Sequence, residues 1–469
     1  MPSPPPRRPR PDDGGANQLG SRVQRGASIA RLSASTGAGF LASRVRGLRD
    51  GEAAEQRFHA ETAEKIVELL GSMKGAAMKL GQIASFVDLD LPPEVQQTYR
   101  DVLADLRDAA PPVDSDAIAE VIRDEFGAPV DDVFAHWDRE PLASASIGQV
   151  HRARLHDGTA VVTKVQYPGV AEAVESDLAN AEAFAPLSKV FSPNLQIRPL
   201  MDELRERLVD ELDYQREAQY QEAFFSRYDG HPFIRVPRVY AEYCRPRVLV
   251  SEYVEGRDFD EMLATSDEAG RRRYGEIIYR FVFGSINRFR IFNGDPHPGN
   301  YLFPASGEVV FLDFGSVKMF RRETRAHLQK QLRAVIDGDA DTLVESLREA
   351  GFLPGGVPDP QKLLTWFRIG QEPILQDREW TYTPEFARDV NRLTSDPRGG
   401  YLDIIRLLNL PPDYLLLNRI QWGVNSILGM LGARANWQRI GREFWEGAEP
   451  ATALGREERP FIDASPFLA

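Results

Sequence analysis

The chain of 469 residues and 52.7 kDa is about three times as long as a typical domain, so two or three packed units are expected. With 42% hydrophobic residues, 27% charged residues and a single cysteine, Cys244, the composition excludes a disordered, collagen-like or disulfide-stapled chain and a cysteine-based metal site. The net charge of −13 argues against nonspecific binding of nucleic acid by the whole chain.

The first 49 residues form a basic arm ahead of an acidic body. They carry nine arginines and two aspartates, a net charge of +7, which leaves −20 on the remainder. Residues 2–11 lack the apolar stretch of a secretory signal, so a disordered leader is expected over residues 1–18. The apolar spacing of residues 19–48 fits an amphipathic helix on an anionic membrane surface about as well as it fits a solvated helix or an unstructured arm. The expected location is therefore the cytoplasm, free or at a membrane surface.

No segment is expected to cross a membrane, because a spanning helix needs about 20 apolar residues. Residues 277–292 are interrupted by three arginines, and residues 414–431 by Asn418, Arg419 and Gln421.

Helical and strand patterns alternate along the chain. Apolar residues recur at helical spacing in five early segments, namely residues 52–86, 96–106, 116–126, 170–190 and 199–228. Alternating patterns beside turn residues predict three strand pairs, namely 143–153 with 160–166, 235–241 with 247–253, and 301–303 with 309–312. The rest of the C-terminal half is expected to be helical.

The strongest chemical signal is Asp295-Pro-His-Pro-Gly-Asn300, followed after a hairpin by Asp313-Phe-Gly315. Phosphoryl transfer needs a carboxylate that orients the attacking oxygen, and oxygen ligands that hold Mg²⁺ against the phosphates. Asp295 fits the first role, and Asn300 and Asp313 fit the second, in the order of the catalytic and metal loops of kinase-like folds. The alternative is that these segments are ordinary turns, which Asp-Pro and Pro-Gly-Asn also favour.

A kinase-like site also needs a strand lysine for the phosphates and a helix acid that holds this lysine. Lys164 is the candidate, although an isolated strand lysine is usually a solvated side chain. On the predicted helix 199–228, four carboxylates are spaced to share one face, those of Glu206, Asp210, Asp213 and Glu217. Glu211 would lie about 120° round the helix from Glu217, so the two acids would need different partners.

Four motifs resemble those of the UbiB-type atypical kinase-like ATPases, also called the COQ-eight/ADCK group. The first is a KxGQ element (Lys79-Leu-Gly81-Gln82), and the second is an ExD element (Glu211-Leu-Asp213). The third is the pair of loops with Asp295 and Asp313, and the fourth is an alanine-rich loop in place of a glycine-rich one. The loop consists of Ala143, Ser144, Ala145, Ser146, Ile147, Gly148, Gln149 and Val150. The resemblance is strong over residues 70–312 and weak over the helices of residues 333–437.

The resemblance implies an α+β, bilobal protein-kinase-like fold with an N-terminal helical extension that carries KxGQ and a helical C-terminal region. The implied division is a leader at 1–18, the extension at 19–110, an N-lobe with inserted helices at 111–255, a C-lobe core at 256–350 and C-terminal helices at 351–469.

The resemblance also implies roles for single residues. Lys164 would pair with Glu217, and Lys79 would reach the cleft and meet Glu211. ATP would contact the alanine-rich loop, Lys164, and Glu252 and Val254 of the hinge strand, with Mg²⁺ on Asn300 and Asp313. The extension would cover the face where a peptide docks, which implies ATP hydrolysis or action on a small or lipid-like molecule. Members of the family are linked to ubiquinone and other isoprenoid quinones at membrane surfaces.

Two further features bear on function. Residues 316–322 are too few for a peptide-binding activation segment of about 20 residues, so phosphorylation of other proteins is disfavoured. Asn293 and Gly294 replace the residues usual before the catalytic aspartate in this group, which leaves the support of Asp295 open.

We therefore expect a Mg²⁺-dependent ATPase or phosphotransferase that serves a lipid or quinone pathway. The alternatives are a small-molecule phosphotransferase of the aminoglycoside and choline kinase type, which residues 294–300 also resemble, and a silent nucleotide-binding scaffold.

Overall fold

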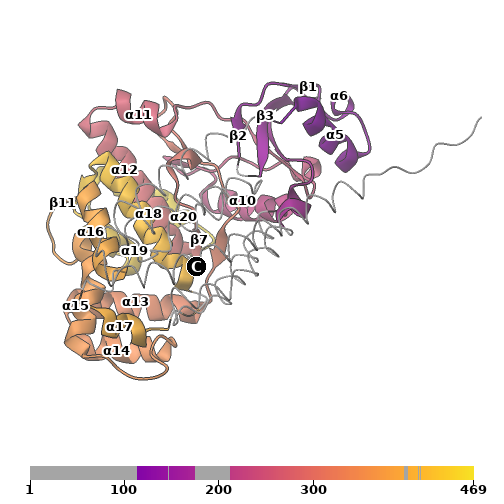
Figure 1. The fold of residues 1–469 in the computed structure, drawn as a ribbon. Coiled ribbons are helices and arrows are strands. Elements are labelled where there is room, and N and C mark those ends of the chain that lie inside the picture. The colour runs from indigo at the N-terminus through magenta and orange to yellow at the C-terminus, as the bar shows by residue number, and fades with distance from the viewer. Residues whose placement is uncertain are drawn as a thin grey trace, which may run out of the picture. The chain divides into compact units, whose positions relative to one another are not determined.

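The computed structural model describes residues 113–145, 147–174, 212–395, 400–409, 411 and 414–468. The chain divides into two compact units, one of Met1–Pro111 with Gly169–Leu208 and one of Pro112–Pro168 with Val209–Ala469. Nearly all described residues, and all elements labelled in Figure 1, belong to the second unit. The finer division into five segments stays a prediction.

A five-stranded antiparallel sheet forms the N-terminal lobe of this unit. β4 (Ala160–Gln166) lies between β3 (Gly148–Arg154) and β6 (Val248–Glu252). β1 (His136–Trp137) and β2 (Ala143–Ser144) both pair with β3. Helices α5 (Ser115–Phe126) and α6 (Val130–Val133) complete this lobe.

The side chains of β4 alternate between the two faces of the sheet. Val161, Thr163 and Val165 are fully buried, whereas Val162 and Lys164 are only partly covered. Because successive side chains of a strand point to opposite faces, Lys164 leaves the apolar core and faces the other side of the sheet.

Two predicted strand arrangements are wrong. Residues 143–153 do not form one strand, because β2 folds back on β3 and pairs Ala143 with Val150. Residues 235–241 do not pair as a strand with 247–253. Instead, β5 (Ile234–Arg235) pairs in parallel with β9 (Val309–Phe311), and only an isolated bridge joins Val239 to Ser251. The third predicted hairpin is confirmed, since β9 pairs with β8 (Tyr301–Leu302).

Helix α10 (Tyr214–Tyr228) packs on β6 and covers the C-terminal part of the predicted helix 199–228, of which residues 199–211 lie outside the described residues. Asp213 is its N-cap, with φ −110° and ψ 89°, and its side chain accepts hydrogen bonds from the N–H groups of Gln215 and Arg216. A carboxylate at this position satisfies N–H groups that the first helical turn leaves without partners. The predicted helical face of four carboxylates is therefore wrong at Asp213, which caps the helix instead.

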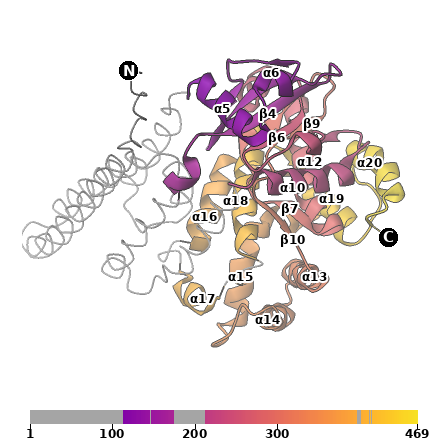
Figure 2. The ribbon, with the colours of Figure 1, turned by 90° about the vertical axis from the view of Figure 1, so that its right-hand side faces the viewer.

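Helices make up most of the C-terminal lobe. α18 (Leu415–Leu431) packs against both α12 (Glu268–Gly284) and α16 (Pro384–Ser395), as Figure 2 shows. Apolar side chains of α12 and α18 form the main core together with those of β8 and β9. The other helices are α11 (Phe259–Thr265), α13 (Arg322–Asp337), α14 (Ala340–Glu349), α15 (Pro360–Gln371), α17 (Leu402–Leu407), α19 (Trp437–Trp445) and α20 (Ala453–Ala464).

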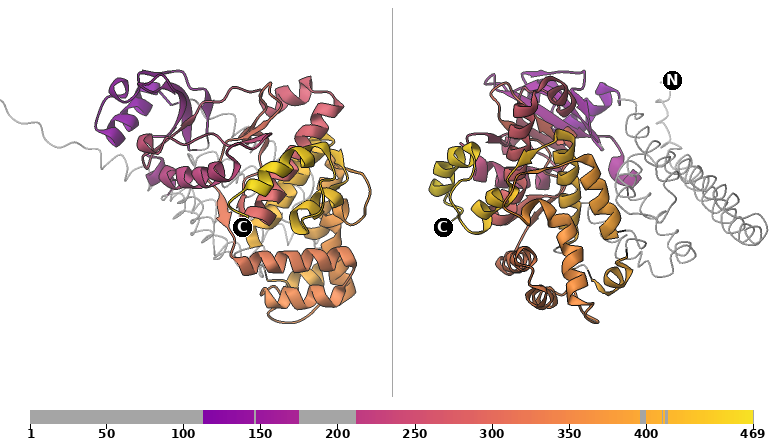
Figure 3. Two further views of the ribbon diagram at one scale, coloured as in Figure 1. Left: turned by 180° about the vertical axis from the view of Figure 1, so that it is seen from behind. Right: turned by 90° about the vertical axis from the view of Figure 1, so that its left-hand side faces the viewer.

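A second apolar cluster lies among α13, α14, α15 and α17, drawn in orange tones in Figure 3. The short strands β11 (Trp380–Thr381) and β12 (Arg434–Ala435) pair with each other. The unit is thus a mixed α+β structure of two lobes, as predicted. Among the described residues, no helix has both the length and the apolar character that a bilayer span requires.

A buried ion cluster joins α12 to the two C-terminal helices. Arg280 is fully buried and donates to Glu443 of α19 at 2.8 Å and to Glu458 of α20 at 2.9 Å. Burial alone would raise the pKa of Glu458, but the hydrogen bond with His231 and the attraction of Arg288 and Arg280 lower it to about 2. Glu458 is therefore ionised, and Arg280, which interrupts the apolar segment 277–292, is its buried counter-charge.

We predict that Arg280→Met lowers the free energy of unfolding by about 3–5 kcal/mol, because it leaves the buried Glu443 carboxylate without its cation and removes one of the two arginines that pair with Glu458. Urea unfolding of the purified protein measures this loss. Arg459→Met is the matched control, since Arg459 pairs with Asp463 on the exposed side of α20 and its removal should change stability little. Equal losses for the two variants would show that the buried cluster does not hold the C-terminal helices.

Candidate functional site

Three charged residues meet where the two lobes join. The Lys164 Nζ atom donates to both carboxylate oxygens of Glu217, at 2.7 and 2.9 Å, and lies 3.8 Å from Asp313 Oδ2. The Glu217 side chain is 3% exposed and that of Lys164 18%, so this pair is shielded from solvent. The ring of Tyr214 lies 5.0 Å from Nζ and adds a cation–π contact that the sequence did not reveal.

The surroundings of Lys164 keep it charged. Burial alone would lower the pKa of its ammonium group, but attraction to Glu217 and Asp313 outweighs burial and holds the pKa well above its usual value. A lysine that stays protonated and sits beside a carboxylate-bearing loop is suited to binding an anionic ligand.

Asn293 joins the two predicted loops, a role that the sequence analysis did not assign to it. It ends β7 (Ile291–Asn293), and its Oδ1 accepts a hydrogen bond from the Asp295 N–H at 3.0 Å. Its Nδ2 donates to the backbone carbonyl of Asp313. The side-chain amide of Asn293 thus supports the backbone of Asp295. Its position just before Gly294 and Asp295 is the sequence feature that could have indicated this role.

The segment after Asp313 is also fixed by backbone pairing. β10 (Val317–Met319) pairs with β7, and the Gly294 N–H donates to the Ser316 carbonyl at 2.6 Å. This two-stranded ribbon was not predicted. The chain then enters α13 at Arg322, which confirms the short connection expected from the sequence.

Asn300 lies beside the loop that carries Asp313. Its Nδ2 donates to the Asp295 carbonyl at 3.2 Å, and its own carbonyl accepts from the N–H of Leu312 at 3.0 Å. The Asp313 Oδ1 atom accepts from the Gly315 N–H at 2.9 Å. These contacts place the backbone of Asn300 against that of Leu312, the residue before Asp313, so the two predicted metal ligands lie on adjoining loops.

The alanine-rich loop is the tip of the β2–β3 hairpin. At Gly148 a Cβ atom would lie 2.3 Å from the Val165 carbonyl oxygen, so only glycine allows β3 to approach β4 this closely. The Gln149 side chain is fully buried and bonds to the Val113 carbonyl at 3.1 Å and to His151 at 3.2 Å. Any ligand contact at Gln149 therefore involves its backbone.

The predicted hinge residues end β6 and follow it. The carboxylate of Glu252 is 2.5 Å from Nη2 of Arg235 and accepts from the Arg238 N–H at 3.3 Å. Val254 is buried. Because the Glu252 carboxylate already has protein partners, a nucleotide at the hinge would contact the backbone of these positions.

Three predicted site residues, Lys79, Ser146 and Glu211, lie outside the described residues. The contact expected between Lys79 and Glu211 stays a prediction.

We predict that Glu217→Gln lowers the pKa of Lys164, because the variant removes the nearest negative charge while burial of the ammonium group persists. Acetylation of Lys164 by acetic anhydride, followed by mass spectrometry between about pH 7 and pH 10, reports the fraction of neutral amine. Glu222→Gln, on the exposed side of α10, is the control and should leave the labelling curve unchanged. The same curve for both variants would contradict an electrostatic link between Lys164 and Glu217.

Comparison with known proteins gives the family. Residues 105–347 match the model of the ABC1 atypical kinase-like domain. "Atypical kinase COQ8B, mitochondrial" of Rattus norvegicus is 33% identical over 71% of this chain and 64% of its own length. "Probable protein kinase UbiB" of Azotobacter vinelandii is 32% identical over 59% of this chain and 52% of its own length. The chain thus spans less than two-thirds of either relative.

A solved structure is similar as well. "The complex structure of Rv3197-erythromycin from Mycobacterium tuberculosis" superposes with a TM-score of 0.60 at 29% identity, and the match covers 84% of this chain and 98% of that one. These findings confirm the predicted bilobal kinase-like fold class and the predicted UbiB-type resemblance. The chain belongs to the ABC1 atypical kinase-like family.

Proposed function

We propose that this protein is a Mg²⁺-dependent ATPase or phosphotransferase of the UbiB type that acts in isoprenoid-quinone or other lipid metabolism at a membrane surface. The observation that carries the proposal is the Lys164–Glu217 ion pair, 3.8 Å from Asp313 at its nearest oxygen, beside the loop that carries Asp295. The names of the relatives, COQ8B and UbiB, support the pathway.

The residues present fit bound ATP and Mg²⁺. The charged Lys164 would bind phosphate oxygens, and the tight approach at Gly148 brings the alanine-rich loop over β4 without a side chain in the way. Mg²⁺ is usually held by one or two protein oxygens together with substrate phosphates, and Asn300 and Asp313 would supply these oxygens. When bound, Mg·ATP supplies the phosphoryl group that is transferred.

The catalytic roles follow from the two loops. The Asp295 carboxylate would orient the attacking hydroxyl or water and accept its proton. Asn293 would keep that carboxylate in register with Asp313, because its amide bonds to the backbone of both residues. Positioning of this kind supplies most of the catalysis in phosphoryl transfer.

The acceptor is proposed to be water or a small or lipid-like molecule. After Gly315 the chain forms β10 and enters α13 at Arg322, with no room for a peptide-binding segment of about 20 residues. The similar structure from Mycobacterium tuberculosis is a complex with erythromycin. A large, mostly apolar acceptor is in keeping with both observations.

We predict that Asp295→Asn lowers the rate of phosphate release from Mg·ATP by about 10²–10⁴-fold and leaves nucleotide binding intact, because it removes only the proton acceptor. Asp313→Asn should instead abolish Mg²⁺-dependent nucleotide binding, which calorimetric titration with and without Mg²⁺ measures. Asp337→Asn, on the exposed end of α13, is the control for the same change of side chain.

The alternatives give different outcomes in these assays. Tight binding of nucleotide by the unaltered protein without phosphate release would favour a silent scaffold. A rate that liposomes and small phenols leave unchanged would count against the lipid proposal.

We further propose, from the family resemblance, that Lys79 reaches the nucleotide cleft from the N-terminal extension. Lys79→Ala is then expected to change the rate of phosphate release while the thermal unfolding midpoint without nucleotide stays the same. Unchanged turnover in this variant would remove the proposed role of the extension.

A further inference from the structure

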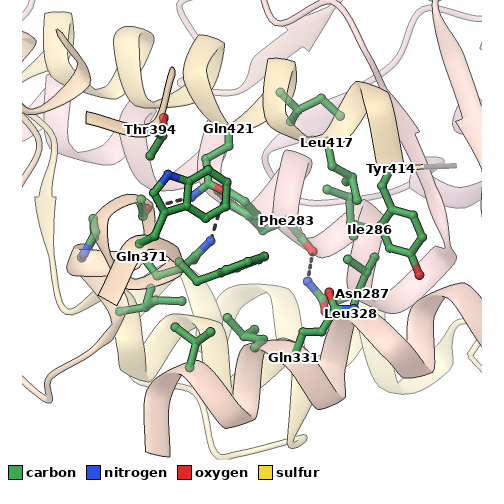
Figure 4. Close-up of a pocket in the computed structure, with 18 of the residues that line it drawn as sticks. Phe283, Ile286, Asn287, Leu328, Gln331, Gln371, Thr394, Tyr414, Leu417 and Gln421 are labelled. Carbon is green, nitrogen blue, oxygen red and sulfur yellow. Dashed lines mark hydrogen bonds between the residues drawn. The ribbon is translucent and has the colours of Figure 1, made fainter. Parts of the chain in front are cut away.

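A cavity of about 480 Å³ lies within the C-terminal lobe, away from the charged site. Figure 4 shows side chains that line it from α12, α13, α15 and α18, and from the π-helix η2 (Ser285–Phe289). Its volume falls within the range of about 300–1,000 Å³ that is typical of ligand sites.

The described part of the cavity wall is free of charge. Among the described residues, its lining is apolar, aromatic or uncharged polar and has no aspartate, glutamate, lysine, arginine or histidine, although 27% of the whole chain is charged. A charged ligand in such a wall would lose its hydration without gaining a counter-charge. The wall therefore selects an uncharged, largely apolar molecule.

Two hydrogen-bond donors in this wall have no partner among the described residues. They are Nε2 of Gln331, whose side chain is more than nine-tenths buried, and Nε1 of Trp366. Buried donors without an acceptor are rare and destabilising, so such a group indicates a missing partner. A ligand oxygen would supply it.

The other amides of the wall are already paired. Gln371 donates to Gln421 at 3.1 Å, Gln421 donates to the Gly370 carbonyl at 2.7 Å, and Asn287 donates to the Phe283 carbonyl at 2.9 Å (Figure 4). Among the described amide and indole groups of the wall, the donors that lack an acceptor are therefore those of Gln331 and Trp366.

We propose that this cavity binds a neutral lipid that carries a carbonyl or ester oxygen, and that its occupancy sets the position of the loop that bears Asp295. The site is distinct from the nucleotide site, and binding to it requires neither nucleotide nor turnover. It adds an effector to the proposed function.

Two parts of the wall reach the catalytic loop. The π-helix contributes Ile286 and Asn287 to the cavity and leads through Arg290, a left-handed residue with φ 57°, into β7 and its terminal Asn293. Isolated π-helical turns frequently occur at functional sites. A change in the π-helix would therefore be transmitted to the amide that supports Asp295.

Helix α18 provides the second connection. Ile420 and Gln421 line the cavity, and at Gly423 a Cβ atom would lie 2.5 Å from Cγ of Pro296. The backbone of α18 is therefore in direct contact with the residue after Asp295. A ligand that shifts α18 or restricts its motion would therefore act on the loop that carries Asp295. The π-helix η2 leads to the same loop through β7.

We predict that Nile red, an uncharged dye with a ring carbonyl, binds the purified, nucleotide-free full chain saturably, as measured by its fluorescence. Gln331→Leu and Trp366→Phe should each raise the dissociation constant about 5-fold, because each removes one donor that a ligand oxygen can accept from. Gln329→Leu is the matched control, since it makes the same change on α13 outside the cavity lining and should leave affinity unchanged.

Competition on the unaltered protein tests the site independently of how the variants fold. Monoolein, which is neutral and carries an ester, should displace the dye, whereas oleate, an anion of similar chain length, should not. Equal displacement by both lipids, or equal affinity of Gln331→Leu and Gln329→Leu for the dye, would overturn the assignment.

Backbone hydrogen exchange tests the link to the catalytic loop without any turnover. Saturating monoolein should slow exchange over residues 290–300 in the unaltered protein and have little effect in Gln331→Leu at the same lipid concentration. Displacement of the dye without a change in exchange would show that the ligand binds but does not act on the loop. Failure of ATP hydrolysis, by contrast, would leave both readouts intact and count only against the proposed function.

Discussion

The positive charge of Lys164 determines which groups the rest of the site must contain. An ammonium group with this little exposure requires carboxylates close by, and Glu217 and Asp313 provide them at 2.7 and 3.8 Å. Each of the three residues is positioned by a different device. The alternation of side chains along β4 points Lys164 away from the core. Asp213 caps α10 and so determines where Glu217 lies, and Asn293 holds the backbone of Asp313.

The C-terminal lobe combines one rigid and one incompletely packed region around α12. On one side Arg280 fixes α19 and α20 through buried ion pairs, so α12 has little freedom there. Along the same helix, Tyr279 and Phe283 border the cavity. Protein interiors are ordinarily packed to crystal-like density, so a cavity of about 480 Å³ beside a strongly fixed helix is a place where a ligand can be accommodated without unfolding the lobe.

The features that the sequence predicted are those set by local pattern. The β8–β9 hairpin, the strand that carries Lys164 and the early start of α13 follow from alternation and turn residues within a few positions. The pairing of β5 with β9 could not be found in this way, because the two strands are far apart in the chain and the choice of partner depends on tertiary packing. The start of α10 was missed for a related reason. Helical spacing continues through Asp213, and only the capping geometry shows that the helix begins after it.

Polar residues that act through the backbone were harder still to predict. Asn293 has no motif of its own, and its role depends on β7 and β10 lying side by side. Gln331 lies on α13 and Trp366 on α15, and these two helices pack against each other. That neither donor has an acceptor among the described residues becomes visible only in the packed structure.

The nucleotide site and the cavity differ in charge. The nucleotide site gathers Lys164, Glu217 and Asp313, whereas the described residues of the cavity wall include no charged side chain. The contact of Gly423 with Pro296 leads to the loop of Asp295, and Asn293 leads to the backbone of both Asp295 and Asp313. The Lys164–Glu217 pair joins β4 to α10 within the N-terminal lobe and is held without help from the cavity wall. An effector in the cavity would therefore act on the rate of the chemical step through the Asp295 carboxylate, and through Asn293 it would also reach the backbone of Asp313, to which the binding of Mg²⁺ is assigned.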